Sequence, residues 1–136
     1  MTYADDMWAI YRLCSLFGAT RDLNQHEEWV ALFTQDGSFE IPRIGPRRGH
    51  HDLRILSEEL QLPHGFQAKH YVSNINVAID GDEASGTAYF QFFKIVDSTP
   101  VLAAIGTYVD RFRRVEGEWK FASRVANSET GATLEL

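Results

Sequence analysis

The sequence predicts an α+β fold in which three helices pack on a strongly curved antiparallel sheet. Apolar residues recur mainly at helical spacing in residues 1–60, whereas residues 69–126 form long alternating segments separated by short turns. Helices therefore precede most of the sheet, and neither layer can bury its apolar face alone. We expect the sheet to wrap over the helices as a cone-shaped α+β barrel, whose open end has space for a ligand.

The first helix begins at a capping box, because Thr2 is followed three residues later by Asp5. Its expected apolar face is broad, with Met7, Tyr11, Cys14 and Gly18 on one stripe that Ile10 and Phe17 flank. The helix is expected to end by Asp22, and a second helix follows with Trp29, Leu32 and Phe33 on its buried face. Asp22 lies at this junction, three residues before Gln25, where it is a plausible cap for the second helix.

Shorter elements connect the helices to the main sheet. Residues 34–38 are expected to form a turn, and residues 39–42 a short strand that Pro42 ends or confines to an edge. An arginine-rich loop covers residues 43–49, and leucines at helical spacing predict a third helix over residues 51–60. Residues 61–68 then form a loop that leads into the sheet.

The main sheet begins with a β-hairpin that turns at residues 80–82. The residues of its first strand divide into two faces, one with Tyr71, Ile75, Val77 and Ile79 and the other with His70, Val72, Asn74 and Asn76. The returning strand spans residues 84–96 and is rich in aromatic residues. Turns at residues 97–100 and 116–117 separate two further strands, and aromatics such as Trp119 and Phe121 are expected to fill the closed end of the cone.

Composition limits the possible partners and compartments. A chain of 136 residues with 44% apolar content is expected to form one domain over residues 1–136. Its net charge of -6 argues against nucleic acid or an anionic membrane as the main partner, and a small neutral or apolar ligand fits better. The expected partner is a small apolar, aromatic or polycyclic molecule. The single cysteine, Cys14, excludes an internal disulfide, and no signal-like or membrane-spanning segment is evident, so the cytoplasm is the expected compartment.

His70 is the best-placed candidate for chemistry. It lies at the start of the hairpin on a face that carries polar and apolar residues together, which suits the wall of a cavity. A half-exposed, hydrogen-bonded histidine without a catalytic role is the alternative. No phosphate-binding loop, nucleophile elbow or metal-ligand spacing is present in the sequence, and neither a metal nor a cofactor is expected.

The order of these segments resembles a known family. The segments that carry the resemblance are, in order, two helices, FTQDGSFEIP, a short helix, KHYVSNINVAIDGDEA and GTYVDRFRRVEGEWKFASR. With these segments, the chain resembles the nuclear transport factor two-like superfamily, in its SnoaL-like, scytalone dehydratase-like branch. The resemblance covers nearly the whole chain. It implies a pocket inside the cone and a lyase or isomerase of the dehydratase, dehydrohalogenase or polyketide cyclase type, without a cofactor.

The resemblance also implies roles for individual residues. In dehydratase-like members an Asp at the end of the first helix faces a His at the start of a central strand, and these positions are Asp22 and His70 here. A neutral imidazole is a suitable base for elimination, and the carboxylate orients the ring and stabilises the imidazolium. The expected substrate-binding residues are Tyr11, Asn74, Tyr89 and Arg124. For Asn74 and Arg124, a packing hydrogen bond and a surface ion pair, respectively, stay open as alternatives.

A second resemblance belongs to another functional class. EEWVALFTQDGSFEIP followed by HYVSN also resembles the small subunit of ring-hydroxylating dioxygenases, which scaffolds a catalytic partner. Those subunits are usually longer, whereas the Asp22 and His70 pair favours a free-standing enzyme. A ligand-binding protein without catalysis is the third possibility. We also expect a homodimer, because aromatic residues of the hairpin, among them some of Tyr89, Phe90, Phe92 and Phe93, should lie on the convex face of the sheet.

Overall fold

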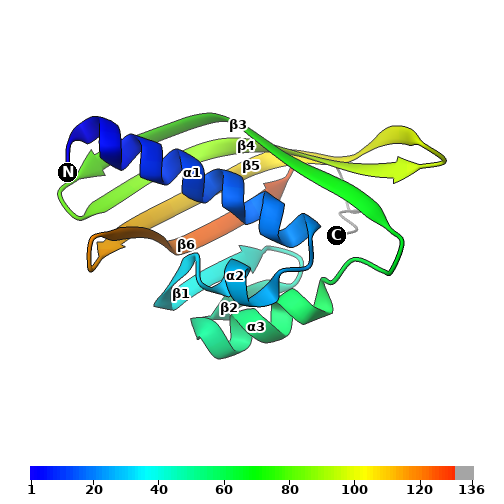
Figure 1. Cartoon of the computed structure of the whole chain (residues 1–136), viewed down its shortest axis with the longest axis horizontal. Helices are drawn as coiled ribbons and strands as arrows, with labels where there is room; N and C mark the ends of the chain where they lie inside the picture. Colours follow the sequence, from blue (N-terminus) through cyan, green and yellow to red (C-terminus); the bar gives the residue numbers. More distant parts are fainter. Residues whose placement is uncertain (131–136) are drawn as a thin grey trace.

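The computed structural model describes residues 1–130 and confirms the α+β architecture (Figure 1). The helices are α1 (Tyr3–Asp22), α2 (His26–Val30) and α3 (Gly49–Glu59). The strands are β1 (Phe33–Ile41), β2 (Gly45–Arg48), β3 (Gln67–Asp80), β4 (Glu83–Val96), β5 (Thr99–Val115) and β6 (Glu118–Ser128). None of the helices in this part of the chain is long and apolar enough to cross a membrane.

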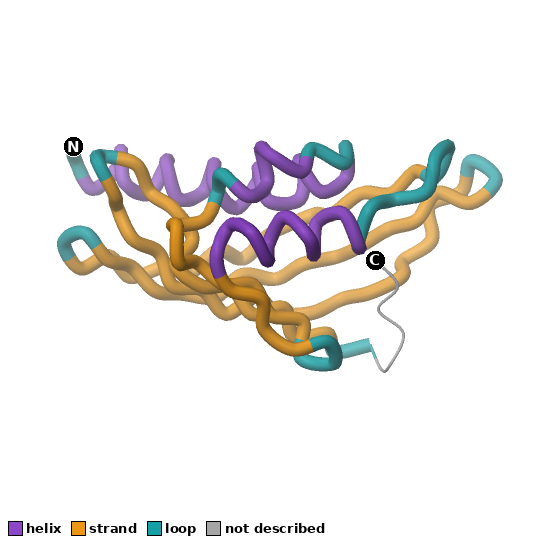
Figure 2. Tube along the Cα trace, turned by 90° about the horizontal axis from the view of Figure 1, so that it is seen from below, coloured by secondary structure: helices purple, strands orange, loops and turns teal. Residues whose placement is uncertain are grey.

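The six strands form one curved sheet in the order β2-β1-β6-β5-β4-β3. Neighbouring strands are antiparallel except for β1 and β6, which run parallel. The sheet is therefore mixed, whereas the sequence predicted an antiparallel sheet. Figure 2 shows the helices together on the concave side of the sheet. The space between the two layers is therefore the place where a buried core and a cavity can form.

The core is dominated by aromatic rings from both layers. Phe17 of α1 lies at its centre, with ring centroids of five others within 5.3–6.4 Å: Trp29, Phe33, Phe39, Tyr108 and Phe121. All five contacts are tilted or edge-to-face, which is the arrangement that the aromatic quadrupole favours. Trp119 and Phe121 are both buried, as expected for the closed end of the cone.

Helix α1 is held at its N-terminus by two sets of polar contacts. The predicted capping box is present, since the Asp5 backbone N–H donates to Thr2 Oγ1 and the Thr2 N–H donates to Asp5 Oδ2. In the same first turn, the buried Asp6 carboxylate accepts hydrogen bonds from Arg114 at 2.8 Å and from the Trp119 indole at 2.9 Å. These contacts join the start of α1 to the hairpin of β5 and β6.

The region after α1 differs from the expectation. Helix α2 has only five residues, and Phe33 already belongs to β1, which also includes the residues expected to form a turn. Gly37 explains why the turn prediction is wrong: a Cβ there would lie 3.0 Å from the Phe121 carbonyl oxygen. This glycine permits a close approach of β1 to β6 instead of a reversal of the chain.

Strand β3 contains an irregularity that the alternating pattern did not reveal. Asn74 has a positive φ of 52°, and the pairing register with β4 shifts between Ser73 and Asn76. His70 and Val72 face inward before this bulge, whereas the odd-numbered residues Ile75, Val77 and Ile79 pack against the core after it. The prediction that Tyr71 shares a face with Ile75 is therefore wrong, because one extra residue reverses the parity of a strand.

Candidate active site

Asp22 and His70 meet at the junction between α1 and β3. His70 Nδ1 lies 2.5 Å from Asp22 Oδ1, and the His70 backbone N–H donates to Asp22 Oδ2 at 2.9 Å. Both side chains are about one-tenth exposed, at 11% and 10%. The predicted approach of the two residues is confirmed, and the carboxylate holds both the ring and the backbone of its partner.

The contacts of Asp22 replace the capping role that its sequence position suggested. The N-cap of α2 is Gln25, which makes no side-chain capping hydrogen bond, and both carboxylate oxygens of Asp22 bind His70. With Nδ1 bonded to the carboxylate, the other ring nitrogen, Nε2, is left to act as the proton acceptor.

Two neighbours fix the position of His70. Gly18 lies directly against its Cβ and backbone, since a Cβ at residue 18 would be 2.9 Å from the His70 Cβ and 3.2 Å from the His70 carbonyl oxygen. On the adjacent strand, Phe92 pairs with His70 and its ring centroid lies 4.4 Å from the imidazole. The absence of a side chain at Gly18 lets α1 approach β3 closely enough for Asp22 to reach the imidazole.

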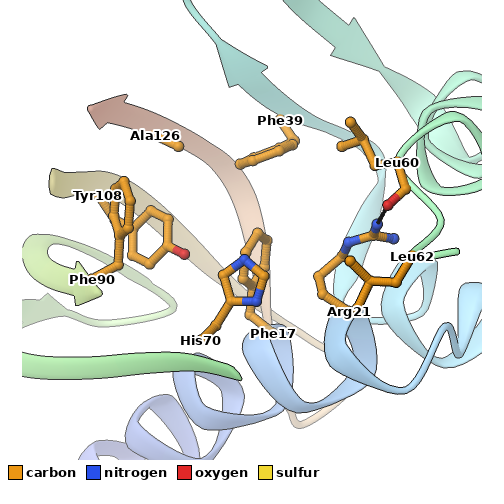
Figure 3. Close-up of a pocket in the computed structure, with 9 residues that line it drawn as sticks. All are labelled: Phe17, Arg21, Phe39, Leu60, Leu62, His70, Phe90, Tyr108 and Ala126. Atoms are coloured by element: carbon orange, nitrogen blue, oxygen red, sulfur yellow. Dashed lines mark hydrogen bonds between the residues drawn. The ribbon is translucent and has the colours of Figure 1, made fainter. Parts of the chain in front are cut away.

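His70 lines a cavity between α1 and the sheet (Figure 3). The apolar walls are formed by Phe17, Phe39, Leu60, Leu62, Phe90 and Ala126. The space between the lining residues is about 470 Å³ including its opening, but only about 20 Å³ is wide enough for the centre of a water molecule. A ligand of ordinary size therefore needs some of these side chains to move apart.

Tyr108 on β5 is a second polar residue of the cavity, and sequence reasoning did not identify it. Its hydroxyl points toward the imidazole of His70 in Figure 3, while its ring stacks on Phe90 at 4.6 Å. Burial raises the pKa of Tyr108 far above its usual range, although Arg124 opposes the shift. The hydroxyl therefore keeps its proton and is suited to donate a hydrogen bond. Its place on the inward face of β5 with Asp110 was the available sequence signal, because an acid on an apolar face indicates a buried polar contact.

Arg124 lies behind Tyr108 and is fully buried. It binds Asp110 through two hydrogen bonds of 2.7 and 2.9 Å, and its guanidinium carbon lies 3.7 Å from the centroid of the Tyr108 ring. Burial alone would lower the pKa of Arg124, but the Asp110 carboxylate outweighs it and raises the pKa. Arg124 thus supports the cavity wall without lining it, and the surface ion pair considered for it is wrong because its partner is buried.

Cys14 lies next to this ion pair and is also buried. Burial raises the pKa of its thiol to about 11, more than the nearby Arg124 lowers it. The protonated thiol is a poor nucleophile, so Cys14 is a core residue.

Arg21 is the third polar residue of the cavity, and it too was not identified from the sequence. It lies on α1 one turn after Phe17 and is 7% exposed. Its guanidinium donates to the Ser57 hydroxyl and to the carbonyl oxygen of Leu60, both at 2.7 Å. A charged residue on the buried stripe of α1, directly before Asp22, was the signal that marked this position.

The remaining predicted site residues lie elsewhere. Tyr11 is 42% exposed on α1, because the buried stripe of that helix runs through Ile10, Leu13 and Phe17 rather than through residue 11. Tyr89 is 51% exposed, since it alternates with the inward-facing Phe90 and points to the convex side of the sheet. Asn74 lies exposed at the bulge of β3 and no longer shares a face with His70. None of the three lines the cavity around His70.

Within residues 1–130, no group of three or more His, Cys, Asp and Glu side chains is arranged to hold a metal ion. His50 instead contacts the Phe33 carbonyl oxygen, and His51 lies beside Asp52 on the surface.

Comparison with known proteins identifies the family. The SnoaL-like domain matches residues 2–125, and the chain therefore belongs to the SnoaL-like family, which confirms the resemblance noted in the sequence. No curated protein matches the chain in sequence.

Several solved structures share the fold. Rv3472 of Mycobacterium tuberculosis, described as of unknown function, is 22% identical with a TM-score of 0.84, and the match covers 96% of this chain and 83% of that one. A type 2 hexachlorocyclohexane dehydrochlorinase (LinA) is 19% identical with a TM-score of 0.81, covering 93% and 86%. A Novosphingobium aromaticivorans protein assigned as the beta subunit of an aromatic-ring-hydroxylating dioxygenase is 20% identical with a TM-score of 0.76, covering 94% and 92%. These likenesses show the fold, which members with different activities share.

Proposed function

We propose that this chain is a cofactor-free lyase or isomerase, in which His70 removes a proton from a carbon of a small apolar substrate. The observation that carries the proposal is the bond between His70 Nδ1 and Asp22 at the wall of an apolar cavity. A carboxylate bound at one imidazole nitrogen fixes the tautomer and leaves the other nitrogen basic. The fold shared with a dehydrochlorinase supports the same class of chemistry.

The reaction begins when His70 Nε2 accepts a proton from a carbon next to a carbonyl group. The bonding electrons move to the carbonyl oxygen and form an enolate, while Asp22 stabilises the positive charge on the imidazolium. Tyr108 donates a hydrogen bond to this oxygen as its negative charge develops. In an elimination, the enolate electrons then return to form a carbon–carbon double bond, the bond to a leaving group on the next carbon breaks, and this group takes the proton from Nε2. In an isomerisation, the proton on Nε2 passes instead to another carbon of a conjugated enolate.

Hydrogen–deuterium exchange tests the proton transfer without the natural substrate. Aromatic ketones with exchangeable α-protons are incubated with the protein in D₂O, and NMR follows the loss of the α-proton signal. His70→Ala and Asp22→Asn should each slow exchange by about a hundredfold or more, because they remove the base or its orientation. The double variant should lose little more than the slower single variant, since the two residues act as a unit.

His51→Ala is the matched control, because the His51 side chain is 88% exposed on α3 and does not line the cavity. It should exchange like the wild type. Circular dichroism confirms that each variant is folded. Equal exchange rates in the wild type and a folded His70→Ala protein would refute the proposal.

A further inference from the structure

We propose that Arg21 forms an anion-binding end of the cavity, so that the substrate is an apolar acid whose carboxylate pairs with this guanidinium. The inference rests on the proposed function of the cavity and specifies its ligand. In the view of Figure 3, Arg21 and Tyr108 lie on opposite sides of His70. The three polar side chains thus line one cavity in which the other walls are apolar.

The partners of Arg21 are all uncharged. Its Nη1 donates to the hydroxyl and the carbonyl oxygen of Ser57, and its Nη2 donates to the carbonyl oxygen of Leu60. Its guanidinium also lies 5.4 Å from the centroid of the Trp29 ring. Within residues 1–130, no carboxylate lies within ion-pair distance of Arg21.

The end of α3 compensates only part of this charge. Ser57 and Leu60 are at the C-terminus of α3, where the helix dipole is equivalent to about half a negative charge. Arg21 therefore has a structural role in capping α3, but a positive charge is left over beside the cavity. Burial lowers the pKa of Arg21 to about 10, even though Asp22 is near enough to oppose the shift.

Arg124 provides an internal comparison. This second buried arginine is matched by Asp110 in a two-point ion pair, so its charge is neutralised by the protein itself. Arg21 has a comparable burial and no such partner. Buried charges in proteins are normally paired, which leaves the contents of the cavity as the counterion of Arg21.

The chemistry of the site favours a carboxylate over other anions. A guanidinium offers a planar fork that matches the two oxygens of a carboxylate, whereas a phosphate normally requires more donors than this apolar cavity provides. A neutral substrate would leave the cation unpaired. The substrate class is then an apolar acid whose carboxylate lies at Arg21 and whose acidic C–H lies at His70.

Binding of benzoate and benzamide tests the inference, because the two molecules have nearly the same shape and differ in charge. Isothermal titration calorimetry measures both affinities, so the signal does not depend on the side chain that is replaced. Benzoate should bind the wild type at least about tenfold more tightly than benzamide. Arg21→Gln should abolish this preference, and Arg21→Lys should keep part of it, since a lysine retains the charge without the fork.

Two control variants separate Arg21 from other positive charges. Arg54→Gln removes an arginine on α3 that pairs with Glu58 and lies outside the cavity, so the preference for benzoate should be unchanged. His70→Gln removes the other cation that the cavity would offer if the His70 imidazole were protonated, and the preference for benzoate should persist. If it disappears in His70→Gln and not in Arg21→Gln, the imidazolium binds the anion and the inference is overturned.

The comparison of benzoate and benzamide affinities in the wild-type protein tests the inference even if Arg21→Gln destabilises α3. Equal affinities for benzoate and benzamide, or no binding of benzoate up to about 10 mM, overturn the inference. These outcomes are distinct from failure of the proposed function, which is measured by α-proton exchange of neutral ketones in the His70→Ala protein. Loss of exchange without His70, together with equal affinities for benzoate and benzamide, would keep the proposed function and reject the role of Arg21.

Discussion

The three polar residues of the cavity, His70, Tyr108 and Arg21, differ in their contacts and in their charge. His70 has one nitrogen bound to Asp22, whereas Tyr108 makes ring contacts and has its pKa raised by burial. Arg21 retains its charge without a carboxylate partner. An imidazole, a phenol hydroxyl and a guanidinium therefore face one small apolar space, which is more than packing alone requires.

Tyr108→Phe tests the hydrogen-bond donor in the proposed reaction. We expect α-proton exchange to slow by about tenfold to a hundredfold, because the enolate oxygen loses its donor. Ketone affinity should change little, since the ring and its stacking on Phe90 are retained. Tyr89→Phe on the convex face is the control and should exchange at the wild-type rate. An α-proton exchange rate in Tyr108→Phe equal to the wild-type rate would show that the Tyr108 hydroxyl does not assist the proton transfer.

The buried ion pair behind Tyr108 predicts a loss of stability. Asp110→Asn leaves Arg124 as an uncompensated buried charge, which should lower the free energy of unfolding by about 3–5 kcal/mol. Asp52→Asn on the exposed surface of α3 should change it by less than about 0.5 kcal/mol. Urea denaturation measures both. Because Asp110→Leu combined with Arg124→Met removes both charges, the double variant should recover much of the stability lost in Asp110→Asn.

At the scale of elements, α1 is the helix that positions Asp22 against His70. It is attached to the sheet at both ends, through Asp6 with Arg114 and Trp119 at the start and through Asp22 with His70 at the end. Between these points Gly18 sets the distance to β3. The helix therefore serves as a spacer whose length and close contact bring its last residue to the imidazole.

Gly18→Ala should disturb this arrangement. In an exposed helix interior, alanine is about 1 kcal/mol more favourable than glycine, but a Cβ at residue 18 would collide with His70. We expect a lower melting temperature and slower α-proton exchange, because α1 or β3 must shift and lengthen the bond between Asp22 and His70. Ser15→Ala on the exposed side of α1 is the matched control and should be neutral or slightly stabilising. A more stable and fully active Gly18→Ala protein would show that the contact relaxes at no cost.

Regular sequence patterns allowed most helices and strands to be predicted. Local irregularities within these elements could not be predicted in the same way. The capping box and the turns at Gly81 and Gly117 set element boundaries close to the observed ones. Asn74 gives no sequence signal of a bulge, because asparagine is also common in ordinary turns. Gly37 predicts a turn when only the local sequence is considered, because its close contact with Phe121 involves a strand that is distant in the sequence.

The candidate site was also predictable only in part from the local sequence. Asp22 and His70 were identified through a family pattern, and their contact joins the ends of two predicted elements. Tyr108 and Arg21 depend on which residues face the cavity, which follows from the curvature of the sheet and the rotation of α1. Neither property is determined by the local sequence.

At the scale of the whole molecule, the convex face of the sheet carries apolar side chains that the helices do not cover. Tyr71, Tyr89 and Val109 are each about half exposed, and Tyr71 packs edge-to-face on Phe93. Of the aromatic residues expected on this face, Phe90 and Phe92 instead point into the core, since they alternate with Tyr89 and Gln91. A mixed polar and aromatic surface of this kind is typical of interfaces between protein chains.

We therefore predict that two copies associate through the convex face to form a homodimer. Sedimentation velocity at micromolar concentration should show a dimer for the wild type, because burying the rings of Tyr71 and Tyr89 removes apolar surface from water. Tyr89→Glu should shift the protein toward monomer, since it places two like charges in a symmetric interface. Tyr3→Glu, on an exposed residue of α1, is the control and should remain dimeric. A wild type that sediments only as a monomer would refute the dimer, and an unaffected Tyr89→Glu dimer would place the interface on another surface.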